Sequence, residues 1–222
     1  MSVDISEILH VLAHELRTPV GIAHGYVRLL LEERLPQDAD RRRALEQMQK
    51  ALGRLSDLSQ ESSRLASWFE HDLDSTATIS AASLLARVEE ADFDAAVAID
   101  ATGISDDAVV RTPDAAMLAT AMVSIVRATA RELRGNDCAV AARLGDPHTL
   151  EVLVGPPDRL EALAAGRTST DAGPLALERG GLGLSLLHAV IVLDAHGAER
   201  WTINQSRQIA GFRLPLAERS ET

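Results

Sequence analysis

The chain has 222 residues, 46% of them hydrophobic, which is enough to form one large domain or two small domains with genuine cores. It carries 22 Lys and Arg residues against 33 Asp and Glu residues, for a formal net charge of -11. This charge repels the phosphates of nucleic acids and anionic membrane surfaces, so we expect neither as a partner.

The sequence also predicts a cytoplasmic protein. Its single cysteine, Cys138, excludes an internal disulfide and suits a reducing compartment. No run approaches the roughly 18 apolar residues of a membrane-spanning helix, and the N-terminus has no basic region followed by an apolar core. We therefore expect neither a membrane span nor an export signal.

A long amphipathic segment opens the chain, from about Asp4 to Leu35. Its apolar residues recur with gaps of four and three, the spacing of a coiled-coil seam: Ile5, Leu9, Leu12, Leu16, Pro19, Ala23, Tyr26 and Leu30. His14 lies off this seam, roughly 200° around the helix from Leu12 and about 160° from Leu16. A helix that buries the seam therefore exposes this imidazole to solvent, where it is available for chemistry.

A second amphipathic segment follows a break at residues 36–40, where Pro36 ends the first helix and Asp38 or Asp40 is expected to cap the next. Its stripe again recurs at three and four: Ala44, Met48, Ala51, Leu55, Leu58, Ser62, Leu65 and Phe69. The short connection predicts an antiparallel hairpin whose stripe is too broad for two helices to cover. We expect a homodimer with a four-helix bundle; the alternative is that the C-terminal half of the same chain covers the stripe.

The helical period stops near residues 71–75, so we expect two domains, at residues 1–74 and 75–222. In the second domain, strands and helices interleave without strict alternation, which predicts an α+β layer of helices on one mixed sheet. The expected helices are residues 81–90, 114–132 and 182–195. The expected strands are residues 76–79, 96–99, 108–111, 138–144, 149–154, 200–204 and 210–214. Ser80 and Asp114 are the expected helix caps, and residues 156–180 are expected to form a loop.

The run His14-Glu15-Leu16-Arg17-Thr18-Pro19, followed by Gly25-Tyr26 and Leu29-Leu30-Leu31, resembles the phosphoacceptor box of two-component sensor histidine kinases. The resemblance implies that His14 carries a phosphoryl group on a ring nitrogen, with Glu15 as the neighbouring base. It also implies that Thr18 positions a water when a receiver domain is dephosphorylated. The chemistry agrees, since neutral imidazole is nucleophilic near pH 7 and an adjacent carboxylate can accept its ring proton.

Two other interpretations of His14 stay open. It can be an ordinary surface residue of an amphipathic helix. It can also pair with His10, four residues earlier, to hold a metal ion, but no neighbouring residue supplies clear third and fourth ligands. We therefore name no metal site.

The second half resembles the ATP-binding domain of the same kinases, a fold shared with gyrase and the Hsp90 chaperones. The resemblance rests on Gly181-Leu182-Gly183-Leu184-Ser185 before a helix that ends at Ala195-His196-Gly197, then on Trp201 and the tail 211–215. It implies that Gly181 and Gly183 approach a nucleotide phosphate, because glycines and unpaired N–H groups at a helix start favour an anion.

Several residues that would bind ATP and Mg²⁺ in that family are replaced here. Ser124 and Ala128 stand where the long helix has asparagines, and neither is an equivalent ligand for a hard cation. Gly155-Pro156-Pro157 follows the strand that should end in Asp-x-Gly, with Asp158 displaced, and Arg179 replaces a glycine of the phosphate loop. We expect no certain cofactor, and ATP with Mg²⁺ only if the kinase is active.

Without Mg²⁺, phosphoryl transfer from ATP should be very slow, which favours a dimeric histidine phosphotransfer protein. Such a phosphorelay protein would exchange a phosphoryl group between His14 and the receiver aspartates of response regulators, and Thr18 would also allow it to dephosphorylate a receiver. One alternative is an active but divergent histidine kinase that phosphorylates His14 from ATP. The other is a non-catalytic dimeric scaffold or regulator.

Overall fold

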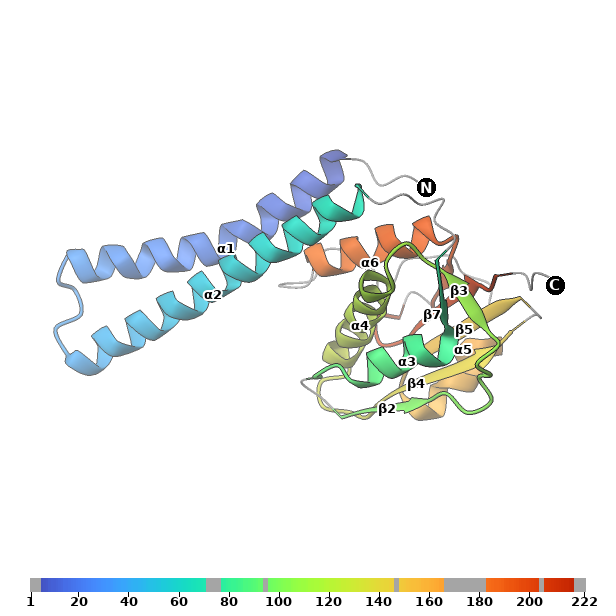
Figure 1. Ribbon diagram of the computed structural model, residues 1–222. Helices are drawn as coiled ribbons and strands as arrows, with labels where there is room; N and C mark the ends of the chain where they lie inside the picture. The colour runs from blue at the N-terminus through green and yellow to red at the C-terminus, as the bar shows by residue number, and fades with distance from the viewer. Residues whose placement is uncertain are drawn as a thin grey trace. The chain divides into compact units, whose positions relative to one another are not determined.

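The computed structural model describes residues 5–70, 77–93, 96–145, 148–165, 183–203 and 206–217 (Figure 1). The chain divides into two compact units, one built around residues 2–69 and the other around residues 70–177 and 185–222. The predicted domain boundary at residue 74 lies outside the described residues.

The first unit is a hairpin of two long helices, α1 (Ile5–Leu31) and α2 (Asp38–Trp68), which run from blue to cyan in Figure 1. The two predicted helices are confirmed. The predicted cap is wrong, since Gln37 is the N-cap of α2 and its side chain makes no capping hydrogen bond. Asp38 and Asp40 lie instead in the first turn, where their charges are favourable near the positive end of the helix dipole.

Each helix of the hairpin buries a narrow line of residues. On α2 this line repeats every seventh residue, through Ala44, Ala51, Leu58 and Leu65, and on α1 it includes Val11, Glu15 and Pro19. Other large apolar side chains of the two helices and of the residue after α2 stay exposed: Ile5, Leu9, Val20, Ile22, Val27, Leu31, Leu45, Leu52 and Phe69. A single hairpin therefore leaves part of the predicted apolar stripe uncovered.

The second unit contains the remaining elements. In chain order they are β1 (Thr78–Ser80), α3 (Ala81–Glu89), β2 (Val97–Asp100), β3 (Val109–Arg111), α4 (Ala115–Glu132), β4 (Cys138–Leu144), β5 (Thr149–Gly155), α5 (Leu160–Ala165), α6 (Gly183–Ala195), β6 (Glu199–Trp201) and β7 (Ala210–Pro215). A short 3-10 helix, Pro157–Arg159, precedes α5. Both predicted caps are confirmed: Ser80 accepts a hydrogen bond from the Ser83 N–H, and Asp114 accepts from the N–H groups of two residues at the start of α4.

Five strands form one mixed sheet in the order β2-β4-β5-β7-β6. β2 pairs with β4 in parallel, and the other neighbours are antiparallel. The predicted α+β layer of helices on a mixed sheet is confirmed. The prediction of a single sheet is wrong, since β1 and β3 form a separate two-stranded antiparallel sheet.

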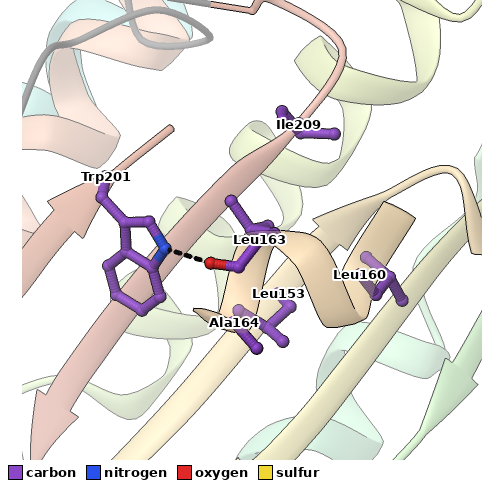
Figure 2. Close-up of a cluster of buried hydrophobic side chains, with 6 residues drawn as sticks. All are labelled: Leu153, Leu160, Leu163, Ala164, Trp201 and Ile209. Atoms are coloured by element: carbon purple, nitrogen blue, oxygen red, sulfur yellow. Dashed lines mark hydrogen bonds between the residues drawn. The ribbon is translucent and has the colours of Figure 1, made fainter. Parts of the chain in front are cut away.

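The prediction of a loop at residues 156–180 is also wrong in its first part, since Leu160–Ala165 form the helix α5. Leu160, Leu163 and Ala164 of this helix are buried in a cluster with Leu153, Trp201 and Ile209 (Figure 2). The indole N–H of Trp201 donates a 3.0 Å hydrogen bond to the carbonyl of Leu163. In both figures α5 lies on one face of the sheet and α4 on the other.

Cys138, at the start of β4, is buried, and burial raises the pKa of its thiol from 9.0 to about 11. The unfolded thiol ionises at lower pH than the folded one, so we expect this cysteine to lower stability as pH rises from about 9 to about 11. Iodoacetamide at about pH 8 should leave Cys138 unmodified in the folded protein and alkylate it in guanidinium chloride, as mass spectrometry would show. Equal labelling rates in the two states would contradict this prediction.

Candidate functional site

His14 lies on the solvent-facing side of α1, with 60% of its side chain exposed. The exposure predicted from its angle to the apolar seam is therefore confirmed. Thr18, four residues further, is also exposed. Residues with this spacing are neighbours on one face of a helix, so α1 presents a nucleophilic imidazole and a hydroxyl together.

Glu15 points the other way, toward α2, and only 4% of its side chain is exposed. Its two carboxylate oxygens face different groups. Oε1 lies 3.9 Å from Nδ1 of His14, and Oε2 accepts a 3.2 Å hydrogen bond from Nη2 of Arg54 on α2. Nη1 of Arg54 lies 3.9 Å from Oε1 of Glu61. The run of residues 14–19 is thus connected to α2 by a line of charged side chains.

The sequence analysis did not identify Arg54, because no motif marks it. A signal is nevertheless present in its spacing. Arg54 follows Ala51 by three residues and precedes Leu58 by four, which is the spacing of the buried stripe. A charge at such a position needs a partner, and here an acidic side chain of α1 supplies it.

Of the two glycines predicted to approach a nucleotide, Gly183 lies among the described residues. Gly183 is the first residue of α6 and is buried. Gly181 and the substituted Arg179 lie outside the described residues. The phosphate-binding role of the glycine pair therefore stays a prediction.

The residues of α4 do not fit Mg²⁺ binding as the family performs it. Ser124 is buried, and its hydroxyl donates a 2.9 Å hydrogen bond to the carbonyl of Thr120 one turn earlier. Ala128 is buried as well and has no donor atom. Among the described residues, no group of three or more His, Cys, Asp or Glu side chains is arranged to hold a metal ion.

The chain after β5 does not fit adenine recognition either. Gly155 packs so closely on Ile209 that a Cβ at residue 155 would lie 2.7 Å from the Cγ2 of Ile209. The chain then turns through Asp158 into α5, on the face of the sheet opposite α4. The first carboxylate after β5 is that of Asp158, and it lies in the 3-10 helix that leads into α5.

None of the helices in the described ranges is both long and apolar enough to cross a membrane. The family described as the His Kinase A (phospho-acceptor) domain matches residues 4–68, which include both α1 and α2. No curated protein sequence matches the chain.

Several solved structures are similar to the chain. The Acinetobacter baumannii histidine kinase AdeS matches with a TM-score of 0.53 and 16% identity, over 92% of this chain and 97% of that chain. Full-length ShkA in complex with AMPPNP matches with a TM-score of 0.46 and 18% identity, over 97% of this chain and 46% of that chain. A bacterial phosphotransferase matches with a TM-score of 0.44 and 13% identity, over 96% of this chain and 98% of that chain. The likeness to AdeS is one of fold, and it confirms the predicted hairpin followed by an ATPase-type domain.

Proposed function

We propose that this chain carries a phosphoryl group on His14 and exchanges it with the aspartates of response-regulator receiver domains, because its residues 4–68 match the His Kinase A (phospho-acceptor) domain. The observation that carries the proposal is the exposed His14 imidazole in the phospho-acceptor domain, with Nδ1 on the side of the buried Glu15 carboxylate. A proton kept on Nδ1 leaves the lone pair of Nε2 ready to attack phosphorus.

From this chain, the proposed transfer uses only side chains of the hairpin. Nε2 of His14 forms the new N–P bond while the P–O bond to the receiver aspartate breaks, and the aspartate leaves as a carboxylate. The imidazole ring gains positive charge because Nδ1 keeps its proton, and Glu15 offsets that charge. The receiver would supply the divalent cation that offsets the charge on the transferring phosphoryl group.

We favour a receiver over ATP as the phosphoryl donor because of the residues in the second unit. Its α4 offers an engaged hydroxyl and an alanine in place of amide ligands, and its β5 runs into α5. A transferring phosphoryl group whose charge is not neutralised by a held cation reacts slowly. The runner-up is a divergent kinase that holds ATP through other residues, and the third candidate is a scaffold.

The proposal includes a cytoplasmic homodimer whose phosphoacceptor hairpins, residues 1–74, pair as a four-helix bundle. The exposed apolar residues of α1 and α2 support it, because pairing would remove them from water. Thr18 lies on the exposed face of His14, and we assign to it the positioning of water when a receiver is dephosphorylated.

Two phosphoryl donors separate the candidates. The protein is incubated with radiolabelled ATP and Mg²⁺ and, separately, with radiolabelled phosphorylated receiver domains, and acid-labile label on the chain is measured. We expect label from a receiver and none above background from ATP. Label from ATP alone would make the protein a kinase, and label from neither donor would leave the scaffold.

A further inference from the structure

We propose that Arg54 of α2 is the positioning residue of the phosphoacceptor site. It holds the Glu15 carboxylate on the Nδ1 side of His14 and so directs the phosphoryl group to Nε2. This inference rests on the proposed function of His14. It adds a residue that lies 39 positions away from Glu15 in the sequence and outside the phosphoacceptor box.

The argument begins with the burial of Glu15. A carboxylate that is 96% buried needs compensating charge or hydrogen bonds, because desolvation of an uncompensated ion costs several kcal/mol or more. Arg54 supplies both through the 3.2 Å hydrogen bond from Nη2 to Oε2. Arg54 therefore offsets part of the cost of burying the Glu15 carboxylate.

The second step concerns direction. Because Oε2 is held by Arg54, the other oxygen, Oε1, faces Nδ1 of His14 at 3.9 Å. This distance is longer than a hydrogen bond, as catalytic contacts often are before the substrate binds. The attraction between Oε1 and the ring grows when phosphorylation makes the ring positive, and the exposed His14 side chain can turn to shorten the distance.

The third step concerns what holds Arg54 itself. Its second terminal nitrogen, Nη1, lies 3.9 Å from Oε1 of Glu61, about two turns further along α2. The Arg54 side chain is only 27% exposed, and its guanidinium faces two carboxylates, one from each helix. A planar guanidinium can face both at once, whereas a lysine ammonium acts as a point charge. The arrangement thus favours arginine at this position.

The test uses phosphoramidate, a small phosphoryl donor that needs no receiver. Nε2 or Nδ1 attacks phosphorus, the P–N bond of phosphoramidate breaks, and ammonia leaves. Phosphorus NMR distinguishes the two phosphohistidine isomers, and its time course gives the rate. Such an isomer ratio reports on the orientation of the imidazole and would not change through a general loss of stability.

The variants are Arg54→Gln, Arg54→Lys, Glu15→Gln and the double variant Glu15→Gln/Arg54→Gln, with Arg64→Gln as the matched control on an exposed position of α2. Wild type and Arg64→Gln should give the Nε2 isomer. Arg54→Gln should give both isomers, at a rate lower by about tenfold. This loss is smaller than the usual contribution of a positioned general base to the rate. Arg54→Lys should recover part of the rate. The double variant should match Glu15→Gln, because Arg54 acts through that carboxylate.

Each result has one meaning. If wild type takes no phosphoryl group from phosphoramidate or from a receiver, the proposed function fails. If wild type does so and Arg54→Gln keeps its rate and isomer ratio, the function stands and this inference is wrong. If Arg54→Gln loses its helical circular dichroism, the rate of the double variant is compared with that of Glu15→Gln to test the inference. Both of these variants carry an uncharged glutamine at residue 15, so neither buries an unpaired carboxylate. A slower double variant would then overturn the inference.

Discussion

The His14→Ala variant is expected to take up no phosphoryl group from a phosphorylated receiver. The substitution removes the ring nitrogen that forms the N–P bond, so the loss should reach the background of the assay. Because the side chain is 60% exposed and alanine favours helices, the folded state should change by no more than about 0.5 kcal/mol. Labelling and thermal unfolding, followed by circular dichroism, measure the two effects.

Matched controls exist on the same helix. His10 and His24 are exposed histidines of α1, at four residues before and ten residues after His14. His10→Ala and His24→Ala should both keep the label, since neither lies in the phosphoacceptor box. If His14→Ala kept the label and His10→Ala lost it, the phosphoryl acceptor would be a residue other than His14, which would contradict the assignment.

The Trp201→Ala variant is expected to lose about 3–5 kcal/mol of unfolding free energy, as for other large aromatic side chains removed from a core. The Trp201 indole is buried among α5 residues and lies so close to Gly211 that a Cβ at residue 211 would clash with the ring. Alanine would leave a cavity between α5 and the sheet and remove the hydrogen bond to Leu163. Urea unfolding measures the change as a lower midpoint.

Trp201→Phe is the matched control for this cavity. It keeps an aromatic ring near Gly211 but removes the N–H donor, so the carbonyl of Leu163 loses that hydrogen bond. The cost should be about 1–2 kcal/mol, well below that of alanine. If alanine at residue 201 cost no more than an ordinary surface substitution, the packing of α5 on the sheet would be refuted.

Much of the molecule could be predicted because its signals are local. The three-and-four spacing of apolar residues predicted both helices of the hairpin, and the same spacing placed His14 on the exposed side. Ser80 and Asp114 were predictable as caps, because a helix start depends on one side chain and the next few N–H groups. These features involve residues within one or two turns of each other.

Other features could not be predicted because they depend on distant residues. The six-residue helix α5 is too short to show a period, and its place depends on a tryptophan 38 residues from Leu163. The separate pairing of β1 with β3 joins strands on either side of α3 and β2. Such short elements are stabilised by what they pack against, and their own residues do not reveal the partner.

The sequence by itself determined that His14 lies on the exposed side of an amphipathic helix, because a helical period assigns each residue to a side. The run around it resembles a phosphoacceptor box. Only the tertiary structure decided which way Glu15 points and that Arg54 meets it. That contact depends on how far α1 is displaced along α2, and the packing of the two buried stripes sets this register. The position of the carboxylate beside the imidazole is therefore a property of the hairpin as a whole.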